Sequence, residues 1–282
     1  MPESRKRLLK NKSCLESVSE DVFVKRRIVE FFRIFALVYW KNEIPLRAAG
    51  VSYFVFFSLV PLLTTFAAVV LLLPVLRGEA EQIFLYLTHW LLPDAIQDVQ
   101  THIRALAEHA TVVSIASLGL TLWLLVKIIF FLEKTQNKIW GFDSPKSPLR
   151  LMRKAAFVFT FLIAVVSIGV YVSGNKLESA LVEITSTWLF FLGFNMILPA
   201  QRRSLASALP GSLVGGLAWY GTKWAFTSYI VLFAKPDKFY AILGILPLVF
   251  LWLHFSVVIL LLSACFNVSL EKLFATEAGG RT

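Results

Sequence analysis

The strongest constraint in this sequence is a series of six apolar segments, each close to the ~20 residues that a helix needs to cross a bilayer core. A membrane-spanning backbone must satisfy its own hydrogen bonds, so each segment is predicted to be an α-helix. Only 16% of the 282 residues are charged, against about 25% in soluble domains, and the mean hydropathy is +0.70. The predicted fold class is therefore all-α, a polytopic membrane bundle of six transmembrane helices. The segments cover approximately residues 48–73, 111–132, 155–174, 179–198, 208–232 and 240–266.

Two further helical regions are predicted outside these spans. Residues 22–41 place phenylalanine and isoleucine among lysine and arginine, the basic amphipathic pattern of an interfacial helix on a membrane surface. The outer loop over residues 74–110 contains two helix-like stretches, which we expect to cap the mouth of the bundle. The domain scheme is then a flexible basic cytoplasmic tail (1–21), a six-helix membrane domain (22–272) and a cytoplasmic tail (273–282).

Basic residues are distributed unequally between the two sides of the predicted bundle. The N-terminal stretch, the connectors 133–154 and 199–207 and the C-terminal tail hold 21 of the 28 lysines and arginines, and the opposite side holds five. The positive-inside rule then places both termini in the cytoplasm. This asymmetry accounts for the net charge of +10 without a nucleic-acid partner. Membrane lipids are the expected partners, with anionic headgroups at the basic cytoplasmic face, and the oligomeric state stays open.

Two opposite charges lie inside neighbouring apolar segments. Glu183 and Lys223 each lie 15 residues from the cytoplasmic end of their segment, so both are roughly 22 Å above it at 1.5 Å per residue. A lone charge inside the membrane costs about 2.5–3.5 kcal/mol on insertion scales. We therefore predict that Glu183 pairs with Lys223. Two roles stay open: a structural pair or snorkelling towards the outer interface, or handling of substrate or protons.

His254 is the third candidate site residue, near the middle of the last segment. A titratable ring there is able to relay protons, and the alternative is a neutral ring hydrogen-bonded to a neighbouring helix. Gly211 and Gly215 form a small-xxx-small pattern that indicates close helix contact. The chain shows no phosphate-binding loop, nucleophile elbow or zinc motif. We therefore expect no cofactor, no metal, no catalytic residues and no ATP-driven step on this chain.

Four stretches of the sequence resemble the YihY/BrkB family of bacterial inner-membrane proteins, once mislabelled as ribonuclease BN. They are "RAAGVSYFVFFSLVPLL" (47–63), "NKIWG" (137–141), "LPGSLVGGLAWYGTKWAFTSYIVLF" (209–233) and "YAILGILPLVFLWLHFSVVILLLSACFN" (240–267), within a resemblance over roughly residues 30–272. The residues that match the family pattern are Pro61, Trp140, Gly141, Pro210, Gly211, Trp219, Tyr229, Tyr240, Gly244, Trp252 and Asn267.

The resemblance implies six crossings, an inner-membrane location and a lysine at the position of Lys223. The chain departs from the family at the end of the last segment, where the family usually has Gly-Ala-Glu-x-Asn. Here Cys265 stands at the acidic position, so a role of that acid does not transfer. The resemblance suggests an envelope protein that handles or moves a lipid or other amphiphile by a non-ATP mechanism. The alternative is a non-transporting scaffold or accessory subunit for envelope assembly.

Overall fold

The computed structural model describes residues 25–72, 110–143, 154, 176–201, 203–233 and 238–279. Within these ranges the regular secondary structure is helical and contains no strand, which confirms the all-α class for the described part of the chain. A first helix covers residues 25–41. The long helices that follow are α2 (Ile44–Leu72), α5 (Ala110–Trp140), α7 (Lys176–Ile197), α8 (Leu205–Phe233) and α9 (Lys238–Gly279).

Three helical stretches of the described chain are long and apolar enough to cross a membrane: Ile44–Leu62, Ala116–Trp140 and Pro247–Thr276. A shorter apolar helix covers Leu181–Ile197. The predicted segment 155–174, the loop up to residue 109 and the tail 1–21 lie outside the described residues. The count of six crossings therefore stays a prediction.

Two helices extend beyond their predicted C-terminal ends. α5 continues to Trp140 rather than ending near residue 132, and α9 continues to Gly279 rather than ending near residue 266. The apolar run marks where a helix meets lipid, whereas backbone hydrogen bonding continues into polar sequence beyond it. The family stretch 137–141 is therefore the end of a helix, and the predicted tail from residue 273 begins inside one.

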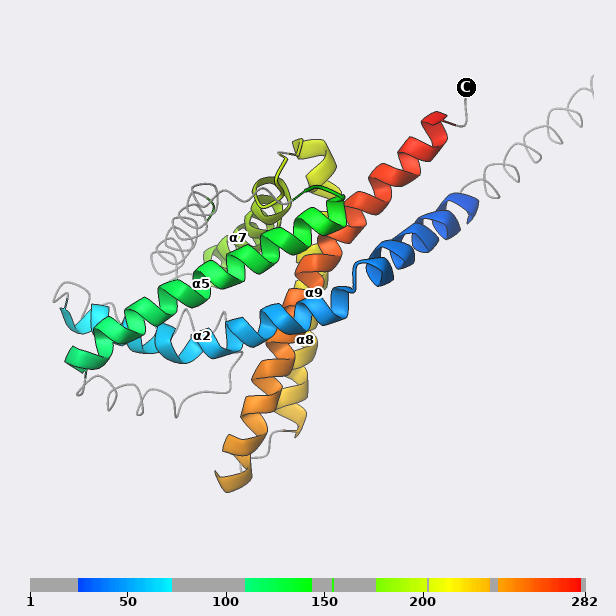
Figure 1. The fold of residues 1–282 in the computed structure, drawn as a ribbon. Coiled ribbons are helices and arrows are strands. Elements are labelled where there is room, and N and C mark those ends of the chain that lie inside the picture. Colours follow the sequence, from blue (N-terminus) through cyan, green and yellow to red (C-terminus); the bar gives the residue numbers. More distant parts are fainter. Residues whose placement is uncertain are drawn as a thin grey trace, which may run out of the picture.

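The helices form a bundle in which α2 and α5 run antiparallel side by side, and α8 runs along α9 (Figure 1). α9 also contacts α2, and α7 packs against α8. The helix over residues 25–41 packs onto α9, since the rings of Phe31 and Phe266 lie 4.9 Å apart. It still exposes Ile28, Phe32 and Trp40. Its placement at a membrane surface stays a prediction.

The contact between α8 and α9 is close because glycines face it. A Cβ atom on Gly211 would lie 2.1 Å from the Ser263 carbonyl oxygen, and one on Gly215 would lie 2.7 Å from Ser263 Cβ. The close helix contact predicted from these two glycines is therefore present. Further along the interface between α8 and α9, the ring of the buried Trp252 stacks on that of Phe226, with 5.1 Å between ring centres. The centre of the Trp219 ring lies 5.8 Å from that of Trp252.

Candidate functional site

The two opposite charges predicted to pair do so. Lys223 on α8 donates a hydrogen bond from Nζ to Oε1 of Glu183 on α7, and the two side chains are only 13% and 19% exposed. The Lys223 ammonium also lies 5.9 Å from the centre of the Trp219 ring one turn away. An ammonium paired with a carboxylate and placed over an aromatic ring is a stable way to hold charge among apolar helices.

An apolar cavity of about 370 Å³ lies among α2, α5, α7, α8 and α9. This volume lies within the range of small-molecule binding sites. Lys154 is the one charged side chain among the described lining residues, and hydroxyls come from Ser58, Thr187 and Ser256. The apolar lining includes Val51, Leu59, Ile129, Leu132, Phe191, Phe194, Trp219, Trp252, Val257 and Leu260.

The Glu183–Lys223 pair lies just beyond one end of this cavity. The lining residue Thr187 is one helical turn from Glu183, and its hydroxyl donates to the Glu183 carbonyl oxygen at 2.8 Å. Likewise, the lining residue Trp219 is one turn from Lys223. Neither charged side chain lines the cavity itself, so the pair is adjacent to the apolar space rather than inside it.

His254 is separate from both the pair and the cavity. Its neighbours Leu253 and Val257 line the cavity, but His254 is about 100° around the helix from Leu253. The ring lies 6.1 Å from that of Phe255, and no hydrogen bond joins it to the described residues. The structure thus brings together two of the three predicted site residues and leaves His254 apart.

The opposite end of the cavity holds an ion pair that the sequence did not indicate. Lys154 Nζ donates to Glu133 Oε1 at 2.6 Å and to the Leu198 carbonyl oxygen at 2.6 Å, and the Pro199 carbonyl oxygen is 3.5 Å away. The side chains of Lys154 and Glu133 are 12% and 10% exposed. The last carbonyls of a helix lack intrahelical partners, and basic side chains favour that position. This preference explains why a lysine contacts the end of α7. It does not predict which of the basic residues in the connector 133–154 makes the contact.

The motif residues Trp140 and Gly141 end α5. Gly141 has φ of 75°, and its N–H donates to the Lys138 carbonyl at 3.2 Å while Phe142 N–H donates to the Asn137 carbonyl at 2.8 Å. These two bonds form a Schellman motif, whose left-handed position favours glycine. Trp140 Nε1 donates to Gln136 Oε1 at 3.1 Å, which fixes the indole.

The fixed indole anchors the connector between α7 and α8. The Arg203 guanidinium lies 3.9 Å from the centre of the Trp140 ring and donates to Glu271 Oε2 of α9 at 2.5 Å. The backbone N–H of Ala200 donates to Asn137 Oδ1 at 2.7 Å. The "NKIWG" stretch thus links the end of α5 to the connector after α7 and, through Arg203, to α9.

Asn267 has a similar role between α8 and α9. Its Oδ1 accepts from Gly211 N–H at 2.6 Å and its Nδ2 donates to the Ala208 carbonyl at 3.1 Å. Pro210 lies between these two residues inside α8 and has no N–H to donate. The asparagine side chain therefore supports the backbone on both sides of the proline.

The remaining motif residues occupy varied environments. Pro61 is buried inside α2, whereas Tyr229 on α8 is 47% exposed. Tyr240 and Gly244 belong to α9, but the surroundings of both residues lie outside the described part of the structure.

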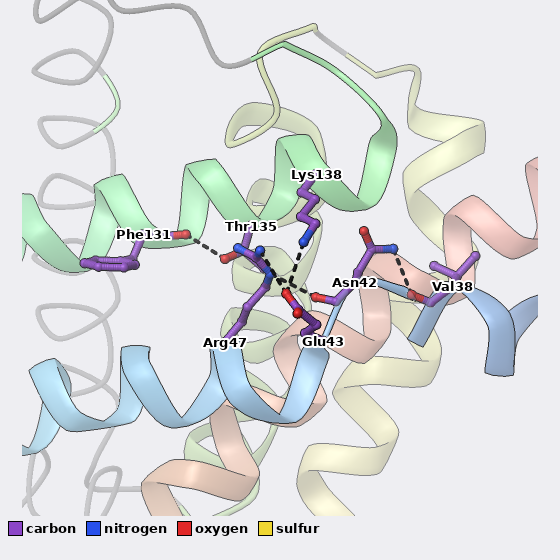
Figure 2. Close-up of polar contacts among 7 residues, drawn as sticks. All are labelled: Val38, Asn42, Glu43, Arg47, Phe131, Thr135 and Lys138. Carbon is purple, nitrogen blue, oxygen red and sulfur yellow. Dashed lines mark hydrogen bonds and ion pairs between the residues drawn. The ribbon is translucent and has the colours of Figure 1, made fainter. Parts of the chain in front are cut away.

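A polar turn joins the first helix to α2 (Figure 2). Glu43 has φ of 53°, and its carboxylate accepts from Lys138 Nζ of α5 at 3.2 Å and lies 3.5 Å from the Arg47 guanidinium. The hydrogen bond and charge of Lys138, followed by the charge of Arg47, lower the pKa of Glu43 below its ordinary 4.5. Asn42 Nδ2 donates to the Val38 carbonyl at 2.8 Å and ends the first helix.

Long apolar helices with opposite charges paired between them define this chain as a helical membrane protein. The sequence model of the family Virulence factor BrkB matches residues 35–281. The chain therefore belongs to this family.

Its relatives include a "UPF0761 membrane protein" of Psychromonas ingrahamii, 25% identical over 82% of this chain and 84% of the relative. A "UPF0761 membrane protein" of Histophilus somni is 24% identical over 90% of this chain and 94% of the relative. One from Chlorobium phaeobacteroides is 24% identical over 86% of this chain, which spans only 58% of that protein's length. No solved structure matches the chain.

Proposed function

We propose that this chain is a multi-pass protein of the bacterial inner membrane that binds and moves a lipid or other amphiphile within its helix bundle, without ATP and without catalysis. The observation that carries the proposal is the apolar cavity of about 370 Å³ with a lysine at one end and a second ion pair just beyond the other. Apolar walls with a few placed polar groups are typical of sites for amphiphilic ligands.

The proposed topology has six crossings, both termini in the cytoplasm and the helix over residues 25–41 at the cytoplasmic interface. The exposed side chains of Ile28, Val29, Phe32, Leu37 and Trp40 support that position, since a basic helix with apolar side chains binds an interface containing anionic headgroups. Lys138, Lys154 and Arg203 then lie on the cytoplasmic side, and the Glu183–Lys223 pair lies towards the outer side.

Glu183 and Lys223 are proposed as the polar step of the path. A headgroup that leaves the apolar cavity past Thr187 meets a carboxylate and an ammonium that exchange partners with it instead of an apolar barrier. His254 is a secondary candidate in this scheme, as a proton-binding group on α9.

The alternative is a scaffold that transports nothing. It is favoured by the well-connected polar contacts at the cytoplasmic end, where Asn137, Arg203 and Asn267 fix the helices to one another. A bundle tied in this way is suited to presenting a rigid surface to partner proteins.

Reconstitution into liposomes separates the two. Fluorescent phosphatidylethanolamine, phosphatidylglycerol and phosphatidylcholine are placed in both leaflets, and an impermeant reductant then bleaches the outer one. Transport predicts that bleaching exceeds the half seen in protein-free vesicles, and that Glu183→Gln with Lys223→Met slows it. Bleaching equal to that of protein-free vesicles for every headgroup supports the scaffold.

A further inference from the structure

The charge and depth of the cavity favour one class of ligand. We propose that its Lys154 end binds the acidic head, a phosphate or a carboxylate, of an amphiphile whose tail lies in the cavity; this rests on the proposed function and specifies its substrate. No anionic side chain is among the described lining residues, and Lys154 is the one cation.

The hydrogen bonds of Lys154 leave one weakly bonded donor for such a head. The ammonium group has three N–H donors. Among the described residues, two of them make short contacts of 2.6 Å, with Glu133 Oε1 and the Leu198 carbonyl, and the third has only the Pro199 carbonyl at 3.5 Å. An acidic oxygen entering from the cavity offers this third donor a better, charge-assisted partner. Glu133 stays behind the ammonium and keeps it in place.

The depth of the cavity fits a tail from one leaflet. Its described lining on α7 runs from Thr187 to Ile197, with Leu198 just beyond the helix end, roughly 15 Å of helix at 1.5 Å per residue. That is about half of a ~30 Å hydrocarbon core. With Lys154 on the cytoplasmic side, an amphiphile of the cytoplasmic leaflet places its head at Lys154 and the end of its tail near Thr187 and Trp219.

Photolabelling of the full-length protein in phosphatidylcholine nanodiscs tests this. The probes are a fatty acid, a phosphatidic acid and a fatty alcohol that carry the same diazirine on the tail, and labelled residues are mapped by mass spectrometry. We expect one or both acids to label cavity residues such as Phe194 and Leu260 roughly tenfold more than the alcohol, as a charged hydrogen bond provides. Preference for one acid identifies phosphate or carboxylate as the head.

Variants assign the preference to Lys154. Glu133→Gln with Lys154→Met removes both charges and leaves neither buried alone, and should abolish the preference while the alcohol still labels. Lys154→Arg should keep it. The matched control is Glu43→Gln with Lys138→Met, which removes a second ion pair that α5 makes with a described residue and should change nothing.

Two results would overturn this inference without affecting the proposed function. One is that the alcohol labels the cavity of the wild-type protein as strongly as the acids do. The other is that the preference for an acid persists in the Glu133/Lys154 double variant. The first of these results is obtained with wild-type protein, so it does not depend on whether a variant folds. If no probe labels the cavity, both this inference and the proposed amphiphile site are wrong.

Discussion

The Lys223 ammonium on α8 hydrogen-bonds the Glu183 carboxylate on α7, one helical turn beyond the cavity-lining pair Trp219 and Thr187. Both charged side chains are less than one-fifth exposed, at 13% and 19%. The charges therefore depend on each other, because either one alone would be a poorly solvated ion among apolar helices.

Removing one member of this pair should cost more stability than removing both. Lys223→Met or Glu183→Leu alone should lower the free energy of unfolding by about 3 kcal/mol, since each leaves an uncompensated charge. Combined, the two changes should cost less than either single one. Thermal unfolding in detergent measures all three, and costs that simply add would show that the pair is not coupled.

Gly211→Ala should destabilise the bundle, because the added Cβ would lie 2.1 Å from the Ser263 carbonyl oxygen. Overpacking of this kind costs about 1–3 kcal/mol. Gly221→Ala on the same helix is the control, since its Cβ would meet nothing within 4 Å, and alanine favours a helix. Equal melting temperatures for the two variants would contradict the close contact between α8 and α9.

Gly141→Ala should weaken the C-terminal end of α5. The residue has φ of 75°, and a left-handed conformation costs a residue with a Cβ about 1–2 kcal/mol. Gly141→Asn should cost less, because asparagine tolerates this conformation. The melting temperatures of the purified variants give the order glycine, asparagine, alanine, and an alanine variant as stable as the wild type would argue against the Schellman end.

The contribution of the Glu43–Lys138 bridge should depend on pH. The folded pKa of Glu43 is below its ordinary 4.5, so the bridge stabilises the folded state above that pH and is lost as pH falls through the folded pKa. Wild type and Glu43→Gln should thus differ in unfolding temperature near neutral pH and converge in acid. A difference that is constant across this titration would exclude the bridge as its cause.

The proposed orientation predicts one-sided labelling at the end of α5. Asp143 is exposed, and Cys265 is fully buried, so Asp143→Cys in a Cys14→Ser background provides an accessible thiol at one site. An impermeant maleimide should label it in inverted vesicles and not in intact cells. Labelling in intact cells would reverse the orientation derived from the basic connectors.

Sequence reasoning located the described helices because a long apolar run has few alternatives in a membrane. It also paired Glu183 with Lys223, since two charges at one depth on consecutive antiparallel helices meet unless one helix is rotated away. It missed Lys154 and Glu133 for the opposite reason. Both lie in a polar, basic connector, where a buried pair looks the same as solvated loop charges.

The sequence by itself determined the helical secondary structure, the close contact at Gly211 and the equal depth of Glu183 and Lys223 in the bundle. These features depend on the spacing of residues along one or two neighbouring helices. Only the tertiary structure decided that residues of α2, α5, α7, α8 and α9 line one apolar cavity, that Lys154 lies at one end of it and that His254 is not among its described lining residues. Those facts depend on how each helix is rotated about its axis, and nearly uniform apolar surfaces leave that rotation to side-chain packing.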